Sequence, residues 1–547
     1  MQKCRFIAIV GIDDGAFSDN SSISCIFNLA EARKEIAMYP GTYALTTPDK
    51  PALIMAATGL RVTYAELEER SLRLANWLRA KGYKRGEVVA LLSDNDPQVF
   101  DVYWAAQRCG LYLTAINFHL NLDEVHYILK NSGARALFLG NSCSDLSAAL
   151  NDLPALTHRI ALHKGREEFL DLEVIIADAS SDRPQYEPRG GDMLYSSGTT
   201  GRPKGVRSPL PERSISQPGD TMMAMFGGHF GFNSDTVYLS PAPLYHAAPL
   251  RTCATVQALG GTAIVMDKFD AQQALTLIDK YRVTASQWVP TMFVRMLKLE
   301  QKVRDKFDVS SMQVAIHAAA PCPVEVKNAM MRWWGPILSE YYSCTELNGM
   351  TIIRPTEWLL KPGSVGKAVL GLIHICDEEG EELLVGKDGL VYFERDDMPF
   401  AYHGDPDKTR STQHPFHSTW TCVGDIGHVD SDGFLFLTDR KAFMIISGGV
   451  NIYPQEVENA LALHPAIADI AVIGVPDAEM GEQVKAVVAL APGLQGNEEL
   501  AQEIIEFAKT KVASYKAPRS VDFTPSLPRT PTGKLLKGEV RKKYWPS

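Results

Sequence analysis

Hydrophobic positions early in the chain switch between helical and strand spacing. Between Leu67 and Leu78 the apolar residues recur on one face at helical intervals, and Thr63 and Glu66 have the spacing of a capping box at a helix start. The uninterrupted apolar run at 88–92 is typical of a strand buried on both faces. The pattern therefore predicts a helix followed by an interior strand.

The same alternation continues through much of the chain. Further helices are expected near 97–108, 122–131 and 273–281, and further strands near 111–116, 134–140, 261–266 and 285–290. Apolar strands separated by amphipathic helices indicate a parallel sheet covered on both faces. An α/β fold is the prediction for this part of the chain.

The pattern changes near residue 430. The polar pair Asp439 and Arg440 precedes a new helix from Pro454, strands near 469–475 and 484–492, and a helix near 498–510. Residues 440–547 thus carry enough elements to form a small domain, and residues 38–439 are expected to form a large N-terminal one. Residues 1–37 lack clear periodicity and Met38 resembles a natural start, so an upstream extension or a loosely ordered segment is expected there.

Composition limits the function classes without choosing among them. The chain has 547 residues, more than one core usually holds, and its formal net charge of −10 argues against a nucleic-acid-binding protein. Nine scattered cysteines without a C-x-x-C pair predict neither disulfides nor zinc, and they fit a reducing, cytoplasmic location. No apolar run approaches the ~18 residues of a membrane span. The short apolar N-terminal stretch is followed at once by acidic residues, which makes a poor signal peptide.

A loop rich in glycine and hydroxyl groups carries the strongest chemical signal. The string YSSGTTGRPKGV spans residues 195–206. Its small residues leave backbone N–H groups free to surround phosphate oxygens, and Lys204 adds a positive charge. Gly205 follows Lys204 where a Walker A loop needs Ser or Thr, and the glycine spacing does not fit the Rossmann pattern. On composition alone, a flexible polar loop is the alternative.

Five further motifs follow this loop in a characteristic order. They are YYSCTE (341–346), GSVGKAV (363–369), TCVGDIGHVDSDGFLFLTDR (421–440), SGGVNIYPQEVE (447–458) and LPRTPTGKLLK (527–537). Over about residues 45–543 the chain resembles the acyl-adenylate-forming superfamily of acyl-CoA synthetases, peptide-synthetase adenylation domains and firefly luciferase. The resemblance implies an α/β fold with a large N-terminal domain of layered, mostly parallel sheets with flanking helices and a β-barrel-like part. It also implies a small mobile α+β C-terminal domain.

The resemblance implies a site for the phosphates of ATP and for Mg²⁺. The β- and γ-phosphates would be held by Ser196, Ser197, Gly198, Thr199, Thr200, Gly201 and Lys204. Thr345 would donate to the α-phosphate. Glu346 and Thr200 would bind Mg²⁺, a hard cation that prefers oxygen ligands. By residue type alone, Glu346 could instead be a helix-capping glutamate.

The adenosine part of ATP would be held by a second set of residues. Tyr342 would stack on adenine, beside a floor of Ala318, Ala319 and Ala320 in the string HAAAP, which replaces the more common S-G-G-A-P. Asp425 would accept hydrogen bonds from both ribose hydroxyls, and Arg440 would contact the ribose or a phosphate. By residue type alone, Tyr342 fits a core position and Asp425 a turn.

The family's two half-reactions would use different parts of the small domain. Lys534 would stabilise the transferring phosphoryl group, although a lone tail lysine is otherwise typical of a solvated charge. After rotation of the domain, Gly448 and Gly449 would lie beside the entering thiol of coenzyme A, since glycine lets a ligand approach the backbone. Ala442 and Phe443 replace polar residues that the family often has after Arg440, which leaves the hinge mechanics open.

The segment after the phosphate loop would line the acyl pocket. It contains Met222, Met223, Met225, Phe226, His229, Phe230 and Phe232. A plain core helix is the alternative. His246 matches a gating position of the family, or else is a core histidine. No buried acid or base in these segments obviously matches the α-ammonium group of an amino acid, and Asp235 is the only nearby candidate. A long-chain, aryl-alkanoic or steroid side-chain acid is therefore expected.

The expected activity is that of an ATP-dependent acyl-CoA ligase. A carboxylic acid and ATP would give acyl-AMP and pyrophosphate, and coenzyme A would then give acyl-CoA and AMP. The alternatives are an adenylating enzyme with a carrier protein or another acceptor, and a non-catalytic nucleotide-binding regulator. The expected partners are the acid, ATP, Mg²⁺ and coenzyme A, and no nucleic acid is expected. A homodimer is a further possibility.

Overall fold

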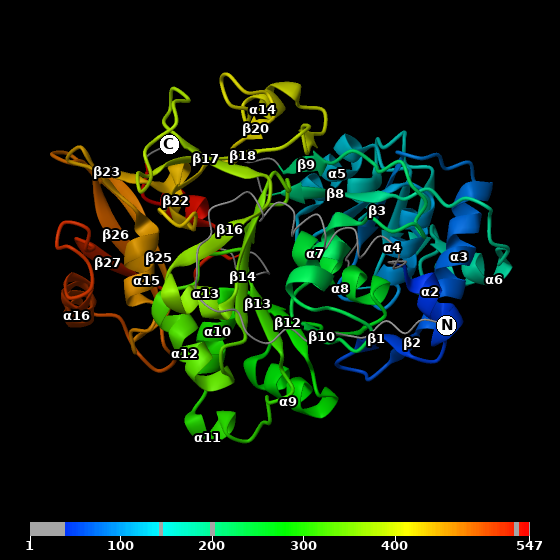
Figure 1. The fold of residues 1–547 in the computed structure, drawn as a ribbon, viewed down its shortest axis with the longest axis horizontal. Helices are drawn as coiled ribbons and strands as arrows, with labels where there is room; N and C mark the ends of the chain where they lie inside the picture. The colour runs from blue at the N-terminus through cyan, green and yellow to red at the C-terminus, as the bar shows by residue number, and fades with distance from the viewer. Residues whose placement is uncertain (1–38, 142–145, 197–202, 530–534, 546–547) are drawn as a thin grey trace, which may run out of the picture.

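The computed structural model describes residues 39–141, 146–196, 203–529 and 535–545 (Figure 1). Two large sheets make up the N-terminal part, and a third, smaller sheet is built from residues beyond 440. The predicted N-terminal extension at 1–37 lies outside the described residues. The same is true of Ser197, Gly198, Thr199, Thr200, Gly201 and Lys534.

The first large sheet has eight strands in the order β19-β9-β8-β4-β3-β5-β6-β7. All pairs from β8 to β7 are parallel, whereas β8, β9 and β19 pair antiparallel. Its strands are β3 (Val88–Leu92), β4 (Tyr112–Ile116), β5 (Ala136–Leu139), β6 (His158–Ala161), β7 (Leu170–Asp171), β8 (Gly191–Ser196), β9 (Lys204–Arg207) and β19 (Ala401–Tyr402). Every residue of β3 is buried, as the apolar run predicts.

The second large sheet has fourteen strands and changes character along its length. It is parallel from β1 through β11, β10, β12 and β13 to β14, and antiparallel beyond β14. The expected β-barrel-like part stays a prediction. Its strands are β1 (Pro51–Met55), β2 (Arg61–Thr63), β10 (Val237–Ser240), β11 (Thr262–Val265), β12 (Ala285–Trp288), β13 (Val314–His317), β14 (Leu338–Ser343), β15 (Met350–Ile353), β16 (Ser364–Leu370), β17 (Leu372–Cys376), β18 (Gly389–Glu394), β20 (Trp420–Thr421), β21 (Asp425–Val429) and β22 (Leu435–Arg440).

Helices cover both sheets, and one core joins them. The helices are α2 (Pro40–Thr46), α3 (Tyr64–Ala80), α4 (Val99–Arg108), α5 (Leu122–Ser132), α6 (Leu172–Asp178), α7 (Thr221–His229), α8 (Ala247–Ala258), α9 (Ala271–Tyr281), α10 (Pro290–Leu297), α11 (Gln301–Arg304), α12 (Val324–Trp334), α13 (Pro355–Leu360) and α14 (Pro406–Arg410), with short 3-10 turns η1 (Ser147–Leu150) and η2 (Lys441–Phe443). The main core cluster contains Leu91 from β3, Trp104 from α4 and Val265 from β11. Because it takes residues from both sheets, the N-terminal part is one packed unit.

The start of α3 shows the local chemistry that the sequence predicts. Thr63 accepts a hydrogen bond from the backbone N–H of Glu66, and the Glu66 carboxylate accepts one from the N–H of Thr63 at 2.8 Å. This reciprocal pair satisfies two N–H groups that a helix start leaves without partners. The predicted capping box is therefore confirmed.

The third sheet has five strands, in the order β24-β23-β26-β25 with β27 beside β26. Its elements are β23 (Ile445–Ser447), β24 (Val450–Ile452), β25 (Ile467–Asp477), β26 (Gly481–Leu490), β27 (Ser520–Thr524), α15 (Pro454–Leu461), α16 (Glu498–Lys509) and α17 (Lys537–Lys542). This unit has its own core around Val457, Val472 and Ile504. The fold is thus mixed α/β, with a large N-terminal part and a small C-terminal one. The exact boundary between Asp439 and Arg440 stays a prediction.

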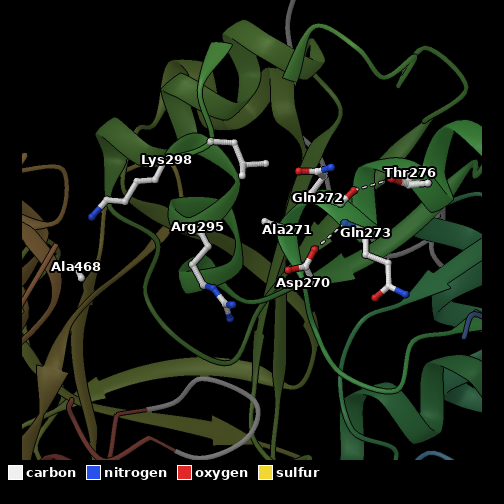
Figure 2. A pocket seen from close by; sticks show the side chains of 9 residues that line it. Asp270, Ala271, Gln272, Gln273, Thr276, Arg295, Lys298 and Ala468 are labelled. Carbon is white, nitrogen blue, oxygen red and sulfur yellow. Dashed lines mark hydrogen bonds between the residues drawn. The ribbon is translucent and has the colours of Figure 1, made fainter. Parts of the chain in front are cut away.

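The small C-terminal part lies against the second sheet of the N-terminal part. Lys298, at the end of α10, donates a hydrogen bond to the backbone carbonyl of Ile467 at the start of β25. Figure 2 shows Lys298 pointing toward Ala468 across a recess that the first turns of α9 and Arg295 also line. Burial lowers the pKa of Lys298, with nearby Asp469 opposing it. The recess is therefore part of the seam between the two parts.

Among the described residues, no helix is long and apolar enough to cross a membrane.

Candidate active site

Glu346 lies in a tight turn between β14 and β15. The turn is held by a hydrogen bond from the Leu347 N–H to the Cys344 carbonyl at 3.2 Å, and Leu347 has a left-handed φ of 51°. The Glu346 side chain is only 7% exposed, and its Oε1 accepts a hydrogen bond from the Tyr402 hydroxyl at 2.8 Å. Glu346 does not cap a helix, and its carboxylate is already held in one direction.

A second acid, Asp425, joins two of the motif residues. Its Oδ2 accepts a hydrogen bond from the Tyr342 hydroxyl at 2.6 Å, and its Oδ1 accepts one from Arg440 Nε at 2.9 Å. Asp425 and Arg440 also face each other in the antiparallel β21–β22 pair. Each carboxylate oxygen has a second lone pair, so Asp425 retains acceptor capacity for a ligand. The ring of Tyr342 packs against Phe393, while its hydroxyl forms the hydrogen bond to Asp425.

The charges of Glu346, Asp425 and Arg440 change the pKa values of the side chains beside them. Burial raises the pKa of the Cys344 thiol well above its usual value, and Glu346 and Asp425 add to that rise. Burial likewise raises the pKa of the Tyr402 hydroxyl far above its usual range, with Glu346 adding to it and Arg440 opposing it. Tyr402 therefore stays protonated and acts as a donor. Residues far apart in the sequence thus form one acidic, partly enclosed site with a cation at its edge.

Lys204 begins β9, the strand that follows the phosphate motif. Its Nζ lies 5.4 Å from the centre of the Tyr402 ring. Burial lowers the pKa of Lys204, with the nearby Lys408 acting in the same direction and Glu346 opposing them. Ser196 ends β8, the strand before the loop, and Thr345 is half-buried beside Glu346. Lys204, at one described end of the phosphate motif, therefore lies near the Glu346 carboxylate.

The predicted adenine floor has one strained residue. Ala319 has a φ of 72°, which a side chain with a Cβ rarely adopts, whereas Ala318 is buried without such a φ. Ala319 is exposed and Ala320 is half-buried. Strain of this kind gathers at functional sites, which is consistent with the expected place of Ala319 beside adenine.

Ala319→Gly is expected to raise the free energy of unfolding by about 0.5–1 kcal/mol. A left-handed φ costs a residue with a Cβ about 1–2 kcal/mol, and glycine removes that cost. Part of this stabilisation is lost because glycine also has a larger conformational entropy in the unfolded chain. Ala318→Gly is the matched control and should lower stability instead. Chemical denaturation of both variants checks this, and equal losses in the two would contradict it.

A buried charge cluster that the sequence analysis missed begins at the residue before this floor. Lys327 Nζ on α12 lies 2.7 Å from Glu340 Oε2 on β14, and His317 Nε2 on β13 lies 3.3 Å from the same oxygen. Lys327 and His317 are fully buried, and Glu340 is nearly so. Burial lowers the pKa of His317 well below its usual value, so this histidine is neutral. His317 precedes the alanine floor and Glu340 precedes Tyr342 by two residues, so the cluster anchors both site segments.

The methionine- and phenylalanine-rich segment forms α7. Five of its predicted pocket residues are buried in the main core, namely Met223, Met225, Phe226, Phe230 and Phe232. The core-helix alternative therefore applies to them, while Met222 and His229 are half-buried. His246 precedes α8, and its ring centre lies 4.5 Å from that of Tyr245. Asp235 is exposed, so it offers no buried partner for an α-ammonium group.

The two glycines of the small part lie at an exposed hairpin between β23 and β24. Gly448 and Gly449 have φ values of 57° and 77°, and a Cβ on Gly448 would lie 2.4 Å from the Met480 methyl group. The left-handed φ values favour glycine at both positions, and the Met480 methyl group would have to shift to admit a side chain at Gly448. Ala442 and Phe443 lie in η2, where Lys537 Nζ is 5.7 Å from the Phe443 ring centre. These contacts leave the hinge mechanics an open prediction.

Comparison with known proteins agrees with the arrangement of motifs. A family model described as AMP-binding enzyme matches residues 42–400, and one described as AMP-binding enzyme C-terminal domain matches residues 456–534. A feruloyl-CoA synthase from Amycolatopsis sp is 33% identical over 518 residues, which cover 93% of this chain and 99% of that protein. The long-chain-fatty-acid–CoA ligase FadD13 of Mycobacterium tuberculosis is 30% identical, over 92% of this chain and 97% of that one.

A solved structure of ATP-bound MatB from Rhodopseudomonas palustris superposes with a TM-score of 0.76 at 27% identity, covering 93% of this chain and 99% of that one. The matches run from the first large sheet through the small C-terminal part, so the likeness concerns the whole architecture. The chain therefore belongs to the AMP-binding enzyme family, within the acyl-adenylate-forming superfamily, and is an enzyme of the AMP-forming acyl-CoA synthetase type.

Proposed function

We propose that this enzyme joins a carboxylic acid to coenzyme A in two steps. A carboxylate oxygen attacks the α-phosphorus of ATP, the bond to pyrophosphate breaks, and acyl-AMP remains. The thiolate of coenzyme A then attacks the acyl carbon, and AMP leaves. The observation that carries this proposal is the convergence of Tyr342 and Glu346, from one segment of the chain, with Asp425, from another, at the site bordered by Lys204 and Arg440.

The first step needs a group that balances charge at the phosphates. Lys204 lies at one border of the site, and Lys534 is proposed to approach from the small domain. A preorganised cation at a transferring phosphoryl group stabilises charge that develops only in the transition state. The glycine-rich loop is proposed to hold the β- and γ-phosphates, with Ser196, Ser197, Gly198, Thr199, Thr200 and Gly201. Thr345 is proposed to donate to the α-phosphate.

Mg²⁺ fits the oxygen donors of this site. Among the described residues, no group of three or more His, Cys, Asp or Glu side chains could hold a metal ion. A single carboxylate, with phosphate oxygens and water, is the usual environment of Mg²⁺ in nucleotide sites. Glu346, with Thr200 from the loop, is proposed to hold the ion, which would neutralise phosphate charge when bound. The buried carboxylate with one oxygen already held supports this assignment.

The nucleoside and the second step are assigned to the remaining motif residues. Tyr342, with Ala319 and Ala320, is proposed to flank adenine, and Asp425 and Arg440 are proposed to bind the ribose. In the second step Gly448 and Gly449 would line the entry of the coenzyme A thiol. Their exposed position at the turn of the hairpin, where neither residue has a side chain, supports this role.

The acid is proposed to be a long-chain, aryl-alkanoic or steroid side-chain acid. The exposed position of Asp235 speaks against an amino-acid substrate. One relative is named as a feruloyl-CoA synthase and another as a long-chain-fatty-acid–CoA ligase, which supports the same class. His246 remains the proposed gate of the acyl pocket.

A pyrophosphate-release assay over a panel of acids tests the function. Release is expected with one class of apolar acids, and thioester should form only when coenzyme A is present. Equal turnover of acetate and dodecanoate would contradict the proposed substrate class. Thioester formed on an added carrier protein, but not on coenzyme A, would move the assignment to the other acceptor.

Compartment and assembly are secondary proposals. The six cysteines in the described part of the chain are all unpaired, which supports a cytoplasmic, reducing location. A homodimer is proposed only as compatible with the fold, and size-exclusion chromatography with light scattering would test it.

A further inference from the structure

Tyr402 connects two motifs that are far apart in the sequence, the Glu346 turn and the phosphate motif that ends near Lys204. Its hydroxyl donates to Glu346 Oε1 at 2.8 Å, across 56 positions of sequence. Its backbone lies in β19, which pairs antiparallel with β9 through Tyr402 and Val206. The strand β9 begins at Lys204, whose ammonium group lies 5.4 Å from the Tyr402 ring centre. One side chain therefore touches the proposed metal-binding acid from the strand beside the phosphate motif.

Tyr402 is itself firmly held. Its ring is 7% exposed and packs edge-on against Phe400 at 5.3 Å, in a small cluster with Val206. Its backbone N–H donates to Thr409 Oγ1 at 2.9 Å, and that hydroxyl donates to the Asp405 carbonyl at 3.0 Å. A donor fixed by packing and by the backbone can orient its acceptor, because little freedom remains at its hydroxyl.

The Glu346 turn is held at its far end by other groups. Arg395 Nη1 donates to the Leu347 carbonyl at 3.1 Å, and Asn348 Nδ2 donates to the Thr421 carbonyl at 3.0 Å. These contacts fix the backbone of the turn. The Tyr402 hydroxyl, with the Cys344 thiol nearby, acts on the carboxylate itself.

We propose that Tyr402 is the positioning residue for Glu346. By donating to Oε1, its hydroxyl orients the carboxylate so that Oε2 binds the Mg²⁺ that accompanies ATP. This inference rests on the proposed function, because it assigns Glu346 to the metal. Groups that orient a metal-binding side chain typically change metal affinity or activity by about 10–100-fold when removed.

Tyr402→Phe tests this role, because it removes the hydroxyl and keeps the ring. The Mg²⁺ concentration that gives half-maximal pyrophosphate release is expected to rise about 10-fold or more. A merely structural loss would lower activity without moving this concentration. As a readout apart from turnover, Mn²⁺ binding to the enzyme with a non-hydrolysable ATP analogue, followed by electron paramagnetic resonance, should weaken by a similar factor.

Tyr64→Phe is the matched control. Its hydroxyl is also buried and donates to the carbonyls of Gln257 and Gly261, far from the site in sequence and in the core. This variant should lose comparable stability and keep the wild-type metal requirement. If Tyr402→Phe fails to fold, Thr409→Val loosens the Tyr402 backbone anchor and should raise the metal requirement in the same direction.

A folded Tyr402→Phe enzyme with wild-type Mg²⁺ and Mn²⁺ dependence would overturn the inference. So would a further loss when Tyr402→Phe is added to Glu346→Ala, because a residue that acts through Glu346 has no effect once that carboxylate is gone. Absence of pyrophosphate release from the wild type itself, with every acid, would instead reject the proposed function.

Discussion

Lys534→Ala is expected to slow acyl-adenylate formation by ~10²–10³-fold, the loss that follows removal of one preorganised donor to a developing charge. The lysine is proposed to act on the phosphoryl group alone. Thioester formation from supplied acyl-AMP and coenzyme A should therefore stay within a few-fold of the wild type. Single-turnover pyrophosphate release and thioester assays measure the two steps separately.

Lys542→Ala is the matched control for Lys534→Ala. Lys542 lies in the same basic tail, on α17, and makes a solvent-exposed ion pair with Glu539 at 2.6 Å. Exposed pairs of this kind contribute little, so both steps should be unchanged. An equal loss of both half-reactions in Lys534→Ala would show that the substitution disturbs the small domain and would reject the proposed role.

Lys327→Met is expected to lower the free energy of unfolding by about 3–5 kcal/mol, because it leaves the Glu340 carboxylate buried without its partner. The two charges are 2.7 Å apart, and Lys327 is fully buried. Burial already raises the pKa of Glu340, and Lys327 opposes that rise. Without Lys327, the acid must bind a proton or bring water into the core. Denaturant unfolding followed by tryptophan fluorescence would measure the loss.

Two further variants make the test of Lys327 specific. Lys302→Met removes one partner of a pair with Glu300 whose side chains are 78% and 68% exposed, and it should change stability by less than about 1 kcal/mol. Adding Glu340→Gln to Lys327→Met removes the stranded charge and should recover part of the loss. A loss below about 1 kcal/mol in Lys327→Met would mean that solvent reaches Glu340 freely.

Local patterns predicted elements where the relevant partners are close in sequence. The capping box at Thr63 and Glu66 involves residues three apart, and the apolar run of β3 reports burial on both faces directly. The segment that forms α7 was ambiguous for a physical reason. Apolar residues on nearly all sides of a helix serve a core and a ligand pocket equally well, and only packing distinguishes them. For Met223 and Phe226, packing decided in favour of the core.

Long-range partners were beyond the reach of the sequence. Nothing near Tyr402 signals that its hydroxyl meets Glu346, because the contact joins β19 of the first sheet to the turn that follows β14 of the second. The cluster of His317, Lys327 and Glu340 is likewise formed by two neighbouring strands and a helix packed on them. In both cases a charged or polar residue of ordinary appearance gains its role from a neighbour on another element.

The sequence by itself determined the family, the alternating elements and the order of the chemical motifs, because these depend on local spacing and residue type. The tertiary structure alone decided which groups share the site. Asp425 receives Tyr342 from one strand and Arg440 from another, and Glu346 receives Tyr402. Those contacts follow from sheet register and from the need to give each buried carboxylate a hydrogen-bond donor, and neither is written in local sequence.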